Sequence, residues 1–245
     1  MKSLCHLAVA ALLFALPAQA VEITVYSPGI VNAPLRQLAA EWTANTGNKV
    51  TFAGNNVGRI RTAVTTGAVP ADVVVAPNAD FTDFAPKVAG PVTPLGRIPF
   101  AIVVKAGGVK PDISTHDKFV AFVKQQGVLA YANPAVGSLT GAMVEDMLKR
   151  PEFAGVERRP IKGLIGEAIV RGDAPYGGGA LTEEIMAQGA EVVGPIPDDF
   201  DLKLDVSAAV LKVSAAPDVA RDFLRYVTRP EAAAVWKVGG VVRAP

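Results

Sequence analysis

Short apolar runs alternate with segments of helical periodicity along the first third of the chain. Three β-branched runs predict strands, at 21–26, 49–52 and 73–75. Apolar residues recur at helical spacing at Leu35, Leu38, Ala39 and Trp42, from Ile60 to Val64, and within 78–85. This alternation predicts the α/β class, with a parallel sheet that has helices on both faces.

A second α/β series follows the strand expected at 99–104, which ends in the glycines of Ala106-Gly107-Gly108. It comprises helices near 119–123, 142–148 and within 161–171, and strands at 128–131, 176–180 and 191–193. We expect Thr182 to cap a helix from Glu183 to Ala187, with Glu183 and Glu184 favouring its N-terminus electrostatically.

An extended segment at 202–211 is interpreted as a return crossover to the first series, followed by tail helices at 218–227 and 230–236. The chain is therefore expected to form two lobes. Residues 21–104 plus 206–245 would form lobe 1, and residues 105–205 would form lobe 2.

The first twenty residues have the form of a secretory signal peptide. Lys2 precedes an apolar run, and Ala18-Gln19-Ala20 has the small-x-small pattern of a cleavage site. We expect cleavage after Ala20 and a periplasmic mature protein that begins at Val21. The apolar run is shorter than the roughly 20 residues that span a bilayer.

Removal of the leader changes the candidate chemistry. It removes Cys5, the single cysteine, and His6, so that His116 is the only histidine left. A cysteine metal site and a disulfide are then excluded, and we expect no metal and no cofactor. The 24 basic and 23 acidic residues become 23 of each once Lys2 is lost. This balance favours neither nucleic acid nor a membrane surface as a partner.

Two predicted strands end in turns that suit an anion. Gly54, Asn55, Asn56 and Gly58 connect the second strand to a helix, whose first turn carries free N–H groups and the positive end of its dipole. Ser27-Pro28-Gly29-Ile30 follows the first strand. Because ligands of parallel sheets lie at the carboxyl ends of strands, both turns are expected at one site. Arg59, Arg61 and Arg171 could add charge-assisted hydrogen bonds.

Several phrases of this sequence, in order, resemble the periplasmic molybdate-binding proteins of ABC importers, a group of type II periplasmic solute-binding proteins. They are Ile23-Thr24-Val25-Tyr26, Phe52-Ala53, Gly67-Ala68-Val69-Pro70-Ala71-Asp72-Val73, Ala174-Pro175, Gln188-Gly189-Ala190-Glu191-Val192-Val193 and Pro230-Glu231-Ala232-Ala233. The resemblance implies a two-lobed fold, each lobe a mainly parallel sheet flanked by helices. It also implies capture of a tetrahedral oxyanion by hydroxyls and backbone N–H groups.

The resemblance also implies ligand contacts. The first hydroxyl of the family falls on Ile30, with Ser27 and Gly29 in the same turn, and the second falls within Asn55-Asn56-Val57-Gly58, beside Arg59. The third contact region is Ser138-Leu139-Thr140-Gly141, of which Ser138 and Thr140 are the expected ligands. The family's second-lobe tyrosine falls on Ala180, with Tyr176 out of register. Ile30 and Ala180 lack hydroxyls, so the sequence departs from the family at both positions.

The predicted function is capture of a molybdate- or tungstate-like oxyanion by a monomer that serves a membrane ABC permease. A different anion, such as sulfate or a small carboxylate, is an alternative ligand. An accessory or interaction protein that retains the fold is an alternative class. An enzyme is not expected, because Ser138 and Thr140 have no evident general base.

Overall fold

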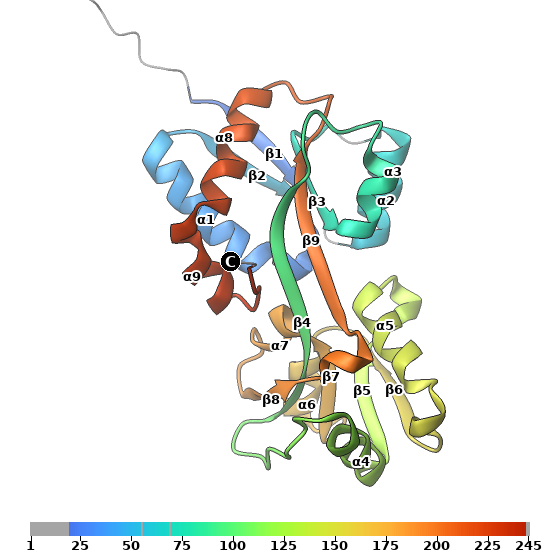
Figure 1. The fold of residues 1–245 in the computed structure, drawn as a ribbon. Helices are drawn as coiled ribbons and strands as arrows, with labels where there is room; N and C mark the ends of the chain where they lie inside the picture. The colour runs from blue at the N-terminus through green and yellow to red at the C-terminus, as the bar shows by residue number, and fades with distance from the viewer. Residues whose placement is uncertain (1–19, 55, 69, 244–245) are drawn as a thin grey trace, which may run out of the picture.

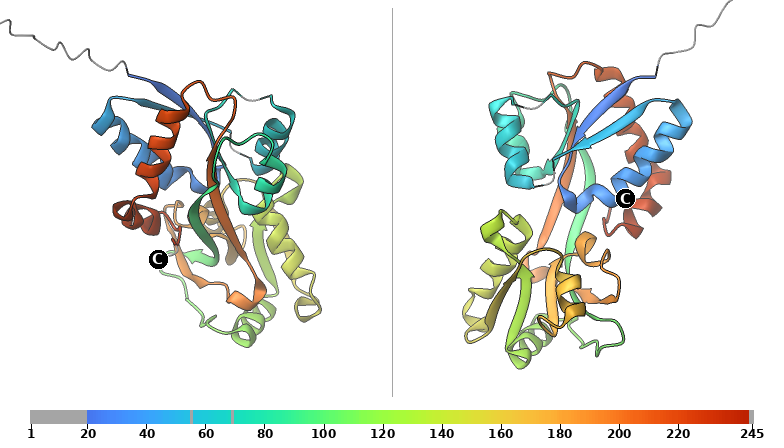
Figure 2. Two further views of the ribbon diagram at one scale, coloured as in Figure 1. Left: turned by 45° about the horizontal axis from the view of Figure 1, so that its top comes forward. Right: turned by 180° about the vertical axis from the view of Figure 1, so that it is seen from behind.

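The computed structural model describes residues 20–54, 56–68 and 70–243. Two α/β lobes are joined by two long strands, β4 (Thr93–Lys105) and β9 (Lys203–Val210) (Figure 1). Both strands cross from one lobe to the other, as the view from behind also shows (Figure 2). The predicted α/β class is confirmed. The signal peptide predicted at 1–20 lies outside the described residues, except for Ala20.

Lobe 1 is built on three parallel strands, β2 (Lys49–Ala53), β1 (Glu22–Tyr26) and β3 (Val73–Pro77). Its helices are α1 (Asn32–Thr46), α2 (Val57–Thr66), α3 (Phe81–Phe84), α8 (Pro217–Thr228) and α9 (Ala233–Val238). Alternate residues of β3 face opposite sides of the sheet. Val73 and Val75 pack with α1, α8 and α9, whereas Val74 packs with α2 and α3. Every residue of β3 is buried, as a parallel strand covered on both faces requires.

Lobe 2 combines parallel and antiparallel pairs. Its strands are β5 (Val128–Ala132), β6 (Glu157–Ile161), β7 (Tyr176–Ala180) and β8 (Ala190–Pro195). Its helices are α4 (His116–Gln126), α5 (Leu139–Leu148), α6 (Ile165–Arg171) and α7 (Leu181–Glu184). Strand β5 runs parallel to β6 and β7, while β4 runs antiparallel to β7 and β8.

The two crossing strands make the sheet continuous, in the order β2-β1-β3-β9-β4-β7-β5-β6. Strand β9 is antiparallel to β3 and β4, because the two crossings run in opposite directions. Residues 93–99 of β4 pair with β9, and residues 100–105 pair with β7 and β8. The lobe boundaries expected from the sequence remain a proposal, since β4 contributes to both lobes.

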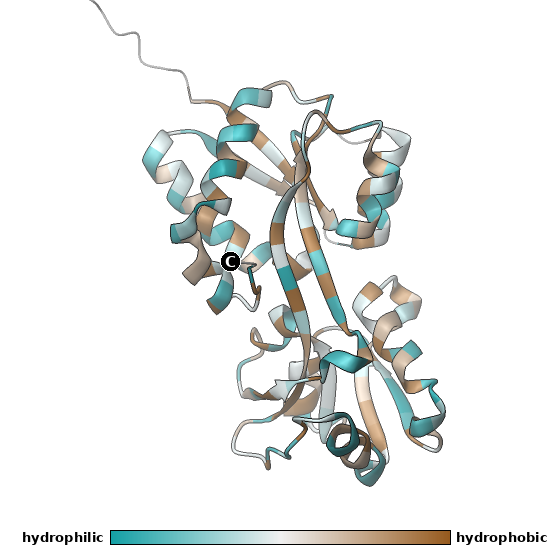
Figure 3. Ribbon diagram, in the orientation of Figure 1, coloured by the Kyte–Doolittle hydropathy of each residue, from teal (hydrophilic) through white to brown (hydrophobic). Residues whose placement is uncertain are grey.

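Burial of large side chains fixes the C-terminal helices on lobe 1. Trp42 of α1 is fully buried, meets Phe223 of α8 edge to face at 5.3 Å, and donates a hydrogen bond to Asp222 at 3.0 Å. Figure 3 shows hydrophilic and hydrophobic residues mixed along α1, α8 and α9, as expected of helices that bury one face. None of the helices in the described ranges has the length and apolar character that crossing a membrane demands.

Candidate functional site

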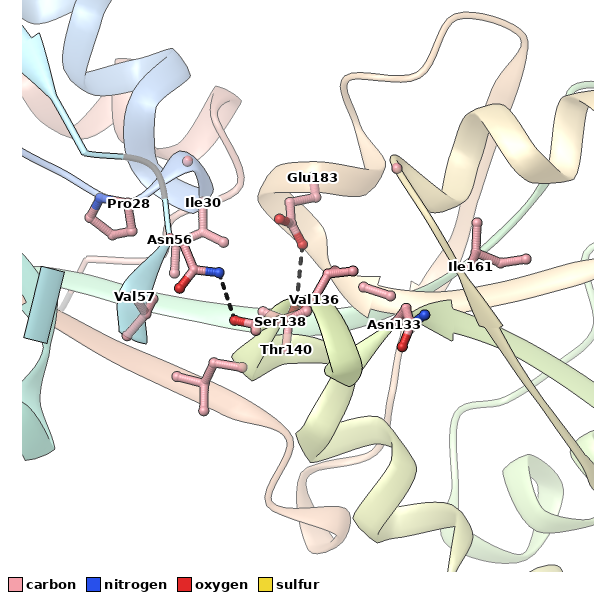
Figure 4. A pocket seen from close by; sticks show the side chains of 15 residues that line it. Pro28, Ile30, Asn56, Val57, Asn133, Val136, Ser138, Thr140, Ile161 and Glu183 are labelled. Atoms are coloured by element: carbon pink, nitrogen blue, oxygen red, sulfur yellow. Dashed lines mark hydrogen bonds between the residues drawn. The ribbon is translucent and has the colours of Figure 1, made fainter. Parts of the chain in front are cut away.

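A cleft of about 290 Å³ lies between the lobes, beside the ends of several strands. Lobe 1 supplies the turn after β1 and the start of α2, and lobe 2 supplies the turns after β5 and β6, the start of α5 and one residue of α7. Its lining residues are Pro28, Gly29, Ile30, Asn56, Val57, Ala132, Asn133, Val136, Gly137, Ser138, Leu139, Thr140, Ile161, Gly163 and Glu183 (Figure 4). This position agrees with the rule that ligands of open α/β sheets bind at strand ends.

The first turn of α5 brings two hydroxyls to the cleft. Ser138 is the N-cap residue, and its Oγ accepts a hydrogen bond from the Gly141 N–H at 3.0 Å. The Oγ1 of Thr140 lies 3.1 Å from the Ser138 Oγ. Backbone N–H groups in this turn and the positive end of the helix dipole favour a negatively charged ligand. The local structure therefore suits an anion.

Asn56 caps α2 on the opposite wall. Its Oδ1 accepts from the Arg59 N–H at 3.3 Å, and its Nδ2 donates to the Gly137 carbonyl at 2.8 Å. Because Asn56 belongs to lobe 1 and Gly137 to lobe 2, this hydrogen bond spans the cleft. Gly137 has φ 85° and comes so close to Asn56 that an added Cβ would lie 2.9 Å from Nδ2. The close approach of the two lobes depends on glycine here.

The structure brings together part of the predicted ligand set. The predicted residues that line the cleft are Gly29, Ile30, Asn56, Val57, Ser138 and Thr140. Gly58 and Arg59 line a neighbouring surface pocket instead. Asn55 lies outside the described residues.

Two predicted contacts are buried away from the cleft. Ser27 is fully buried, and its hydroxyl donates to the Pro28 carbonyl at 3.4 Å. Ala180 is fully buried at the end of β7, where it pairs with Phe100. Ala180 is not among the residues that line the cleft, so its role as a ligand contact stays a prediction.

Arginine does not contribute to the cleft lining among the described residues. Arg61 pairs with Asp83 at 2.5 Å and with Asp80 at 3.7 Å, and Arg171 pairs with Asp173 at 2.9 Å. The charge-assisted bonds expected from Arg61 and Arg171 are therefore made to carboxylates of the protein itself.

Glu183 is the functional candidate that the sequence analysis missed. It is the one ionisable side chain among the described lining residues, and its Oε2 accepts a hydrogen bond from the Thr140 hydroxyl at 3.4 Å (Figure 4). Burial raises the pKa of Glu183, and the Thr140 hydrogen bond opposes part of that rise. A partly buried acid with a raised pKa in a cleft is a characteristic of functional sites.

Glu184, the next residue, is 2% exposed, and neither carboxyl oxygen has a hydrogen-bond partner within the described chain. The pKa of Glu184 is raised to about 8. Burial is the larger cause, and the negative charge of Glu183 is the smaller one. Its carboxyl occupies space left by Gly179, where an added Cβ would overlap it. Gly179 of the glycine-rich strand β7 thus provides room for a buried acid.

These positions correct the helix expected at 183–187. Helix α7 begins at Leu181, directly after β7, so Thr182 lies inside the helix with its hydroxyl buried and unpartnered in the described chain. Glu183 and Glu184 do lie in the first turn of α7, as expected, but Glu184 is buried there. The sequence signal that could have identified this site is a pair of consecutive glutamates, Glu183 and Glu184, shortly after the glycine-rich strand.

Comparisons with known proteins agree with this fold. The chain is 29% identical over 233 residues to an aconitate isomerase of a Pseudomonas species, covering 91% of this chain and 88% of the relative. It is 26% identical over 235 residues to a molybdate-binding protein of Rhodobacter capsulatus, covering 93% and 91%. The substrate-binding domain of a putative molybdenum ABC transporter from Clostridium difficile superposes with TM-score 0.73 at 13% identity, covering 92% of this chain and 100% of that domain.

The two-lobed fold with a cleft at strand ends is the type II periplasmic-binding-protein-like fold that the sequence predicted. The chain belongs to the bacterial extracellular solute-binding protein family, whose sequence profile matches residues 23–241. The resemblance to molybdate-binding proteins expected from the sequence is confirmed.

Proposed function

We propose that this protein captures a small anion in the cleft between its lobes and delivers it to a membrane ABC permease from the periplasm. The observation that carries the proposal is the pair of helix starts, α2 and α5, that line one cleft from opposite lobes. A molybdate- or tungstate-like oxyanion is the first candidate ligand, and sulfate or a small carboxylate is the alternative.

A thermal-shift series with molybdate, tungstate, sulfate and small carboxylates tests this proposal. A ligand that binds only the folded protein adds about 2.7 kcal/mol of stability at a concentration 100 times its Kd. We expect a concentration-dependent rise in Tm with at least one anion. No shift at millimolar concentrations of any of them would contradict solute capture and favour an accessory protein that retains the fold.

The hydroxyl of Thr140 should contribute to anion affinity. In Thr140→Val, loss of a hydrogen bond to a charged ligand should weaken binding by about tenfold, corresponding to about 1.5 kcal/mol. Thr65→Val is the matched control, because Thr65 is exposed on α2 and bonds only to carbonyls of its own helix. Calorimetric Kd values measure the effect, and equal losses in both variants would contradict a ligand contact at Thr140.

We further propose that the lobes open and close about β4 and β9, with the Asn56–Gly137 hydrogen bond favouring closure. In Asn56→Asp the side chain still caps α2, but a carboxylate faces the Gly137 carbonyl. Loss of about 1 kcal/mol should reduce the closed-to-open ratio by about fivefold and enlarge the radius of gyration in small-angle scattering. Asn45→Asp, at the lobe 1 contact with Tyr226, is the control. A radius unchanged in Asn56→Asp would contradict this role.

A second candidate function is isomerisation of a small unsaturated carboxylate, favoured by Glu183 in the cleft and by the isomerase relative. Glu183 would remove a proton from a carbon next to the double bond and return it to another carbon, so that the double bond shifts without net oxidation. Proton NMR of aconitate mixed with the protein tests this function. Conversion by the wild type and none by Glu183→Gln would support it, and an unchanged spectrum with wild type would exclude it for aconitate.

A further inference from the structure

We propose that Glu183 shares one proton with the anion in the cleft, so that the bound state contains a neutral carboxylic acid that donates a hydrogen bond to the ligand. This inference rests on the proposed capture of an anion. The ligands of this site would be anions whose binding is linked to a proton. The proton either arrives with the anion or is taken up from solvent when the anion binds.

The first step is the position of Glu183. Its carboxyl lines the cleft and lies within hydrogen-bond distance of Thr140 (Figure 4). Thr140 in turn lies beside Ser138 at the start of α5. An anion that reaches these hydroxyls therefore comes close to the carboxyl of Glu183.

The second step is the lack of a compensating cation. No salt bridge to Glu183 or Glu184 occurs within the part of the chain that the structure describes, and Glu183 is the only ionisable residue there that lines the cleft. Ionisable groups do occur on the elements that pack against α7, namely β4, β7, β8, α6 and η1 (Gly29–Val31). Each of these groups has another partner or is exposed. Ion pairs join Arg97 to Asp205, Glu191 to Lys110 and Arg171 to Asp173. The Tyr176 hydroxyl donates to the Val109 carbonyl, and Lys105 and Glu167 are exposed.

The chain after α9 also reaches α7, where Gly240 lies against Thr182. The basic residues on either side of it are directed elsewhere. Lys237 is exposed, and Arg243 donates to the Thr228 carbonyl at 2.7 Å. The negative charge of an ionised Glu183 would thus face a bound anion without neutralisation.

The third step is energetic. Two negative charges about 4 Å apart repel by about 4 kcal/mol at an effective dielectric constant of 20, and such a pair relieves the repulsion by holding a proton. A protonated carboxyl instead offers an O–H donor, the kind of group that a buried anion requires. Glu184 acts in the same direction, because an acid buried beside Glu183 makes ionisation of both less favourable.

Calorimetry of molybdate binding in buffers with different ionisation enthalpies counts the protons exchanged, from pH 6 to pH 9. Molybdate carries no proton at these pH values. Any proton taken up on binding must therefore be held by the protein or shared in its hydrogen bond to the ligand. If molybdate gives no heat, aconitate is titrated in the same way. We expect uptake that rises to about one proton per ligand at the alkaline end, with Kd increasing by up to tenfold per pH unit.

Three variants assign the proton. Glu183→Gln keeps an N–H donor at the same place, so it should bind the anion with no proton uptake and with a Kd independent of pH. Glu184→Gln should still take up a proton on binding, but over a lower pH range than the wild type. Glu167→Gln, an exposed glutamate on α6, should behave as wild type. Circular dichroism and Tm establish that each variant is folded.

The outcomes separate the two proposals. Binding without uptake across the whole range, or equal uptake in wild type and Glu183→Gln, would overturn proton sharing and leave anion capture intact. An absence of binding by molybdate, aconitate and the rest of the anion series would overturn capture itself, and the proton-sharing proposal with it.

Discussion

Gly141→Ala is expected to lower the free energy of unfolding by about 3 kcal/mol and to abolish anion binding. Gly141 lies in the first turn of α5, where its missing side chain allows contact with β5. An added Cβ would overlap the backbone carbonyl of Ala132. A backbone oxygen in a buried strand cannot move aside as a flexible side chain can, so α5 must shift and take Ser138 and Thr140 with it.

Chemical denaturation measures the stability change, and the anion series measures binding in whatever folded fraction remains. Gly194→Ala is the matched control, because a Cβ there would meet only the Ile113 side chain at 3.7 Å. That control should change stability by no more than about 0.5 kcal/mol. A Gly141→Ala protein with wild-type stability would show that α5 is not packed against β5 as described.

Glu184→Gln is expected to flatten the pH dependence of stability. The pKa of Glu184 is raised by burial and by Glu183 to about 8, above the ordinary value of 4.5 for a glutamate. Between these values the folded protein holds a proton that the unfolded chain releases, so stability is greatest at low pH and decreases as pH rises. Each pH unit in this window costs about 1.4 kcal/mol per proton, or about 2 to 3 kcal/mol from pH 6 to pH 8.

Denaturation curves at pH 6, 7, 8 and 9 for wild type and Glu184→Gln test this expectation. The wild type should lose more stability than the variant across the series. Glu167→Gln removes an exposed glutamate of the same lobe and should follow the wild type. Parallel profiles for wild type and Glu184→Gln would contradict a buried proton at Glu184.

Hydrophobic pattern predicted most of the fold, because the sheet and its helices bury regular apolar faces. The continuous apolar strand β3 and the helix that carries Trp42 are examples. Strand β6, Glu157–Ile161, was not predicted, because it lies at the edge of the sheet with charged residues and Pro160. Edge strands need no apolar alternation, and charge there opposes aggregation.

The candidate site depends partly on the family resemblance and partly on long-range packing. Ser138 and Thr140 were expected from the resemblance, and the structure places both at the start of α5, one turn earlier than the helix expected at 142–148. Glu183 could not be predicted, because its burial depends on the packing of α7 against β4, which is distant in sequence. The same limitation applies to Arg61, whose partner Asp83 comes from α3.

In the proposed function, these residues form a cleft that would bind anions without a lining cation in the described chain. Helix starts and hydroxyls provide donors, and Glu183 provides a carboxyl whose protonation state depends on the ligand. Such a cleft should discriminate between anions by their ability to accept a hydrogen bond from an acid. It would therefore respond to pH more strongly than a site built on arginine, whose charge is constant.

The most direct test of the account is a crystal structure of the protein with the anion that gives the largest thermal shift. The account predicts one bound anion between the turn after β1 and the start of α5, within hydrogen-bond distance of Thr140 and Glu183. An anion found only outside this cleft, such as in the surface pocket beside Arg59, would contradict it.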